Sequence, residues 1–177
     1  MSGHSKWKQI KHKKATTDEK RAKLFSKLAN VITIAARDGT DPQFNSALRG
    51  AIEVARKNQM PQANIERAVK RATEKGNLEL LLVEAYGPEG IGILVEAITD
   101  NHNRTISELR HLLKEADVKL AEPGSLLWSF EKTGEGYKSK FTPETSEEAR
   151  EKIKNLIEKL EDRDDVKEVY SAIDDPV

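Results

Sequence analysis

The spacing of the apolar residues changes near residue 76 of this chain. Before that point they recur every three or four positions, as at Leu28, Ile32 and Ala35, which is typical of amphipathic helices. Beyond it, residues 80–86 and 91–99 form nearly continuous apolar runs rich in β-branched and long aliphatic side chains, which is typical of strands. The sequence therefore predicts a helical first part and a sheet-containing second part.

Three helices are expected in the first part. Thr16 followed by Glu19 forms a capping box that begins a helix, and Gly39 ends it close to Asp38. A second helix begins after Pro42 and Asn45, and a third begins near Pro61. These short amphipathic helices predict a small bundle over residues 1–76.

The second part alternates strands and helices. A turn at residues 87–90 joins the two apolar runs into a hairpin, and a helix follows the polar residues 99–105. The remaining expected elements are strands at 125–130 and 137–141, a helix at 145–160 and a closing strand at 166–170. The order β-β-α-β-β-α-β predicts an α+β fold, in which residues 77–177 form an α/β sandwich with helices on one side of a mostly antiparallel sheet.

Charge divides at the same place as the apolar pattern. Residues 1–76 hold 17 basic and 7 acidic residues, whereas residues 77–177 hold 13 basic and 23 acidic ones, although the whole chain is neutral. Nine of the first 27 residues are Lys or Arg, and two are acidic. Such asymmetry indicates that the first part binds a polyanion, of which nucleic acid is the commonest in a cell.

Composition excludes several other classes. The chain has no cysteine, so it has neither disulfides nor thiolate metal sites, and its four histidines are too far apart for a local metal motif. No apolar run approaches the length of a membrane span or of a secretory signal. We expect a cytoplasmic monomer with no cofactor, no metal, no small-molecule substrate and no membrane partner.

Four blocks of sequence carry a specific pattern. They are GHSKWKQIKHKK with DEKRAKLFSKL, then NSALRGAIEVARKNQMPQANIERAVKRA, then EAYGPEGIGILVEAITDNHNRTISELRH, and finally EPGSLLWSF. In this order they closely resemble the YebC/PmpR family, over residues 2–131 and again from about 137 to the end. Longer members carry an additional α/β module after the Trp-x-Phe segment at 128–130, so this chain resembles a short form.

The resemblance implies control of gene expression. Members of this family, which includes mitochondrial translational activators of cytochrome oxidase, are described as probable transcriptional regulators that bind DNA. They are also described as factors that act on the ribosome and relieve stalling at proline-rich stretches. The expected partner is therefore DNA or ribosomal RNA, and the polymer stays open.

The basic arm at the N-terminus is the first candidate site. Its candidate residues are Lys6, Trp7, Lys8, Lys11, His12, Lys13, Lys14, Lys20, Arg21 and Lys23. Lysines that neutralise phosphates release counterions, so binding should depend steeply on salt and little on sequence. An exposed Trp7 or His12 could stack on an unpaired base. Alternatively, Trp7 and Ile10 attach the arm to the helical bundle while the lysines stay solvated.

Two further groups are weaker candidates. Arg67, Lys70 and Arg71 lie opposite the apolar stripe of the third helix and either bind phosphate or form an ordinary solvated face. Asn101, Asn103 and Arg104 offer donors to a phosphate or RNA group, or they belong to a strand-to-helix cap.

Other functions are less favoured. Glu84 and Glu96 on the expected hairpin, with Asp100, could begin a metal-dependent nuclease, but no base, nucleophile or histidine accompanies them at a convincing spacing. The alternative is that these carboxylates face solvent. A protein adaptor could instead use the acidic run at 158–168. We therefore predict a non-enzymatic regulator that binds nucleic acid, with DNA as the first target and the ribosome as the alternative.

Overall fold

The first part of the chain folds into three helices around one core. The computed structural model describes residues 18–74, 76–134 and 136–173. The helices are α2 (Asp18–Ala35), α3 (Ser46–Lys57) and α4 (Gln62–Arg71). Leu28, Ile32 and Leu48 are fully buried between them. The helical bundle is therefore the one that the 3.6-residue spacing predicts.

The ends of these helices follow the expected local signals. The helix α2 continues into a 3-10 turn over Ala36–Asp38, and Gly39 follows with a φ of 143°. Asn45 caps α3, because its side chain accepts a hydrogen bond from Leu48 N at 3.0 Å. Thr16 of the predicted capping box lies outside the described residues.

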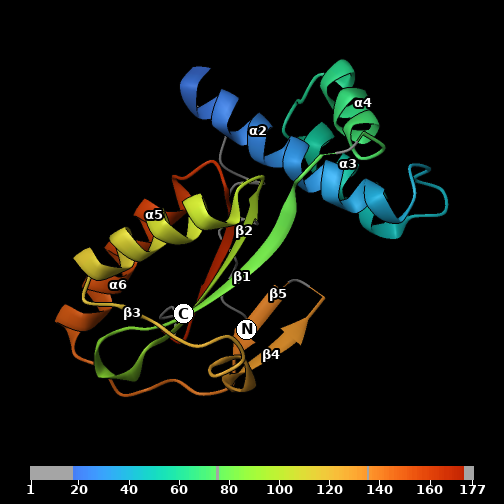
Figure 1. The fold of residues 1–177 in the computed structure, drawn as a ribbon. Coiled ribbons are helices and arrows are strands. Elements are labelled where there is room, and N and C mark those ends of the chain that lie inside the picture. The colour runs from blue at the N-terminus through green and yellow to red at the C-terminus, as the bar shows by residue number, and fades with distance from the viewer. Residues whose placement is uncertain (1–17, 75, 135, 174–177) are drawn as a thin grey trace.

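The second part is built on a four-stranded sheet with the order β3-β1-β2-β6. Its strands are β1 (Glu79–Tyr86), β2 (Gly92–Thr99), β3 (Lys119–Leu120) and β6 (Val166–Ser171). Every pairing is antiparallel. The helices α5 (His102–Glu115) and α6 (Glu147–Glu161) cover one face of this sheet (Figure 1). Leu109, Ile153 and Val95 are fully buried in the layer between sheet and helices. The predicted α+β class is confirmed.

A separate hairpin packs on the opposite face. It consists of β4 (Phe130–Thr133) and β5 (Gly136–Ser139) (Figure 1). Phe130 is buried against Leu94 and Tyr170 of the main sheet, and Tyr137 meets Tyr170 edge to face at 5.4 Å.

Two details of the predicted strand order are corrected. The segment 125–130 is not a strand up to Phe130, because Leu127–Ser129 forms a 3-10 turn. The Glu84 carboxylate accepts hydrogen bonds from the backbone N–H groups of Leu126 and Leu127, which holds the segment in a turn. The strand β3 was not predicted, because it contributes only two residues, a length at which apolar alternation gives no signal.

None of the described helices is both long and apolar enough to cross a membrane.

Candidate nucleic-acid interface

Most of the predicted arm lies outside the described residues. This applies to Lys6, Trp7, Lys8, Lys11, His12, Lys13 and Lys14. The structure describes the end of the basic segment, where Lys20 and Arg21 lie on the exposed side of the first turn of α2. The arm thus leads directly into a helix with exposed cations.

Lys23 and Lys27 face the acidic second half of the chain instead. Lys23 Nζ forms an ion pair with Asp162 at 3.3 Å, and Lys27 Nζ donates a hydrogen bond to the carbonyl of Glu161. The Lys27 side chain is buried, and this desolvation lowers its pKa, although the nearby carboxylates of Glu161 and Asp164 raise it. One turn of α2 is therefore engaged with the end of α6. Lys23 contacts a carboxylate of its own chain at the position where a phosphate contact was expected.

The predicted basic face of α4 is exposed. Ile65 and Ala68 are buried in the helical core, whereas Arg67, Lys70 and Arg71 lie in solvent. Arg71 donates a 3.3 Å hydrogen bond to Asn30 of α2. Both Lys70 and Arg71 belong to the last turn of α4, where positive charge also complements the helix dipole. This face is available to an anion, and its cations have a structural role as well.

The loop before α5 is a helix cap. Asn101 accepts a hydrogen bond from Arg104 N at 3.1 Å, and the Arg104 guanidinium pairs with Asp100 at 2.7 Å. Asn103 is exposed in the first turn of α5. The capping alternative therefore explains Asn101 and the position of Arg104, while Asn103 stays a predicted contact.

A hydrogen-bond network below this loop holds it in place. Thr105 Oγ1 lies 2.9 Å from Thr99 Oγ1 and donates to Asp165 at 2.8 Å, and Arg163 also pairs with Asp165 at 2.9 Å. Burial raises the pKa of the Asp165 carboxyl, but the bonds from Arg163 and Thr105 outweigh it and leave the pKa below its ordinary value. The loop between the end of β2 and the start of α5 is thus held in a fixed geometry.

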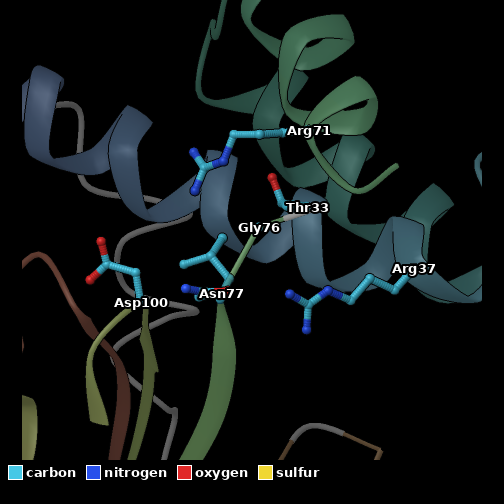
Figure 2. A pocket seen from close by; sticks show the side chains of 7 residues that line it. Thr33, Arg37, Arg71, Gly76, Asn77 and Asp100 are labelled. Carbon is cyan, nitrogen blue, oxygen red and sulfur yellow. The ribbon is translucent and has the colours of Figure 1, made fainter. Parts of the chain in front are cut away.

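A cavity of about 330 Å³ lies where the helical bundle meets this loop. It is lined by Thr33, Arg37, Arg71, Gly76, Asn77, Leu78 and Asp100. Figure 2 shows Arg71 extending from α4 and Arg37 from the end of α2, on two sides of Asn77. The cavity brings the predicted residue Arg71 close to the capping loop.

The sequence did not identify Arg37 or Asn77 as candidates. Arg37 follows the last turn of α2 and Asn77 precedes β1, so they are 40 positions apart and belong to no common motif. Among the described residues, no side chain forms a hydrogen bond or ion pair with the Arg37 guanidinium. Only the three-dimensional arrangement places it beside Arg71.

The carboxylates considered for metal chemistry are structural. Glu84 and Glu96 are buried rather than solvent-facing, and they lie on the sheet face under the β4–β5 hairpin. Their partners in the register are Leu94 and Leu82, so the two glutamates are offset by two residues rather than directly opposed. Glu84 accepts backbone N–H groups, and Lys167 and Tyr170 contact Glu96 at 2.8 and 3.1 Å. Within the described ranges, no group of three potential metal ligands exists.

Comparison with known proteins identifies the family. Residues 5–75 match the model for the TACO1/YebC protein N-terminal domain, and residues 78–140 match the model for the TACO1/YebC second and third domain. A probable transcriptional regulatory protein of Desulfosudis oleivorans is 42% identical over 99% of this chain and 73% of its own length. The chain belongs to the TACO1/YebC family.

Another relative in the TACO1/YebC family has the same name as the Desulfosudis oleivorans protein. A probable transcriptional regulatory protein of Chloroherpeton thalassium is 53% identical over 76% of this chain. The chain spans about half the length of such relatives, since the alignment covers 55% of the Chloroherpeton thalassium protein. The solved structure of a conserved hypothetical protein from Aquifex aeolicus matches with a TM-score of 0.85 and 32% identity, over 97% of each chain. The family membership predicted from the sequence blocks is confirmed.

Proposed function

We propose that this chain is a regulator of gene expression that binds nucleic acid without catalysing a reaction, with DNA as its first target. The observation that carries the proposal is the set of exposed cations on the helical half, at Lys20 and Arg21 on α2 and at Arg67, Lys70 and Arg71 on α4. Relatives named probable transcriptional regulatory proteins support a regulatory role. The cations are of the kind that neutralises a phosphate backbone.

The basic arm is the proposed principal contact. Its seven candidate residues outside the described part precede α2 directly, so phosphate contacts there would continue onto Lys20 and Arg21. Lys23 would join them only by leaving Asp162. In the proposed division, residues 1–76 supply most of the affinity, and residues 77–177 supply the capping loop with Asn101, Asn103 and Arg104.

The test replaces five lysines of the arm by alanine and measures binding to a duplex and to a single strand over a range of salt concentrations. These are Lys6, Lys8, Lys11, Lys13 and Lys14. The matched control replaces five exposed lysines of the second half, namely Lys114, Lys119, Lys132, Lys138 and Lys154. Because each phosphate contact contributes about 0.9 to the slope of log affinity against log salt on a duplex, the arm variant should lose up to about 4.5 from that slope.

An unchanged slope in the arm variant removes the arm from the proposal. Weakening by the control to the same extent would show that net charge alone governs binding. Co-sedimentation with translating ribosomes, compared with binding to duplex DNA at the same physiological salt, decides whether the target is ribosomal RNA or DNA. Association with ribosomes and no preference for DNA would replace transcription by translation as the regulated step and would agree with the alternative expectation for this family.

A further inference from the structure

The cavity between the helical bundle and the sheet has an unusual charge distribution. It holds two guanidiniums, from Arg37 and Arg71, and one carboxylate, from Asp100. Asp100 pairs with Arg104 at 2.7 Å, so its charge is already compensated from outside the cavity lining. The cavity therefore has a net positive lining that is not neutralised by its own acid.

Both guanidiniums keep donors for a ligand. A guanidinium carries five N–H donors, and Arg71 directs one of its nitrogens to Asn30 at 3.3 Å. Arg37 is exposed and has no hydrogen bond or ion pair among the described residues. Figure 2 shows the two side chains entering from different helices, with Asn77 lying between Arg37 and Asp100 in this view. The planar fork of arginine suits the oxygens of a phosphate, which two arginines can hold from two sides.

We propose that this cavity binds a phosphate group of a nucleic-acid strand between Arg37 and Arg71, with Asn77 as an uncharged donor. The inference rests on the proposed function and adds a defined site to it. A strand is the favoured source because Arg71 belongs both to the cavity and to the exposed α4 face with Arg67 and Lys70. Arg71 is therefore the residue at which a backbone bound along the α4 face would meet the cavity.

The position of the site gives binding a second consequence. Arg37 and Arg71 belong to the helical bundle, whereas Asn77 and Leu78 directly precede β1 and Asp100 directly follows β2. A phosphate held by both groups bridges the two halves of the chain. Its binding therefore stabilises their mutual arrangement, in the same way as the contact between α2 and the end of α6.

The first experiment compares Arg37→Ala with Arg110→Ala. Arg110 is an exposed arginine of α5 outside the cavity, so both variants lose the same charge. Binding of a 20-nucleotide single strand is measured against salt. Arg37→Ala should weaken binding about ten-fold at 0.1 M salt and reduce the slope by about 0.7, the value for one contact on a single strand. Arg110→Ala should change neither quantity, and Arg37→Lys should restore only part of the affinity because it lacks the fork.

The second experiment observes the site without a strand. The side-chain Nε–H signals of the arginines are followed by NMR during titration with inorganic phosphate, and separately with adenosine 5′-monophosphate. Signals of Arg37 and Arg71 should move together while that of Arg110 stays in place. If the mononucleotide binds more tightly than the 20-nucleotide strand, the ligand is a free nucleotide and the strand assignment is overturned.

The outcomes separate the two proposals. If the wild-type chain binds the strand, and Arg37→Ala behaves like Arg110→Ala with no phosphate-dependent shift, the cavity site is refuted while the proposed function stands. If the wild-type chain binds no nucleic acid, the proposed function fails. The phosphate titration then decides the cavity alone: shifts at Arg37 and Arg71 support a phosphate site, and their absence refutes it.

Discussion

Replacing Glu84 by glutamine tests how the sheet positions the segment that precedes the β4–β5 hairpin. The buried Glu84 carboxylate accepts three backbone N–H groups, from Gly124, from Leu126 at 2.7 Å and from Leu127 at 2.9 Å. A glutamine side chain has one acceptor oxygen. In its best orientation it keeps the two bonds to Leu126 and Leu127 and turns its amide donors towards the N–H of Gly124.

The magnitude follows from these three bonds. The N–H of Gly124 loses its acceptor at a cost of about 1 kcal/mol, the lower end for an unpaired donor because Gly124 is exposed, and two charge-assisted bonds that become neutral lose about 1 kcal/mol each. Glutamine avoids the desolvation of a buried carboxylate, which offsets part of this loss. We therefore expect Glu84→Gln to lower the free energy of unfolding by about 2 kcal/mol.

Urea unfolding followed by circular dichroism measures this change. Fluorescence of Trp128, recorded in a Trp7→Phe background, reports the turn that Glu84 holds, because Trp128 lies in Leu127–Ser129. The control is Glu131→Gln, which removes an exposed carboxylate from β4. A loss below about 0.5 kcal/mol with unchanged Trp128 emission would refute the role given to Glu84, since that is the scale of ordinary surface substitutions.

Three further changes test other parts of the structure. Burial lowers the pKa of Lys27 below 10.5, so the wild-type chain should gain stability relative to Lys27→Met as pH rises towards 10.5 in urea unfolding. Asp165 has a lowered pKa through its bonds to Arg163 and Thr105 despite burial, so the wild-type chain should lose more stability than Asp165→Asn as pH falls below about 4. Gly136→Ala should cost about 3 kcal/mol in thermal unfolding, because its Cβ overlaps the Tyr170 ring and the residue has a φ of 124°.

Each of these expectations has a contrary result. Parallel pH profiles for the wild-type chain and Lys27→Met would show that the ammonium is solvated. Equal acid sensitivity of the wild-type chain and Asp165→Asn would show that this carboxyl is not stabilised by its partners. A Gly136→Ala variant as stable as Gly134→Ala, whose added Cβ meets nothing within 4 Å, would show that the hairpin moves freely over Tyr170.

Much of the fold follows from local signals. The spacing of Leu28 and Ile32, the cap at Asn45 and the turn between the two strand runs are properties of short segments, which physical rules read without knowledge of the whole. The segment 125–130 was misassigned because its turn depends on the Glu84 carboxylate, 42 positions away from Leu126. The hydrogen bonds to the buried Glu84 carboxylate outweigh the strand propensity of this segment, and only the folded sheet brings that carboxylate close to it.

For the candidate site, too, some features follow from the sequence and others only from the tertiary structure. The sequence alone determined the charge asymmetry between the two halves, the amphipathic faces and the family pattern. These depend only on the residue composition, on the spacing of apolar residues and on the order of short sequence blocks. Tertiary structure decided which cations stay available. It paired Lys23 with Asp162, assigned Asn101 to a helix cap, and placed Arg37 and Arg71 around one cavity. Such contacts join residues distant in the chain, and the free energy of each depends on burial and distance, which a linear pattern does not contain.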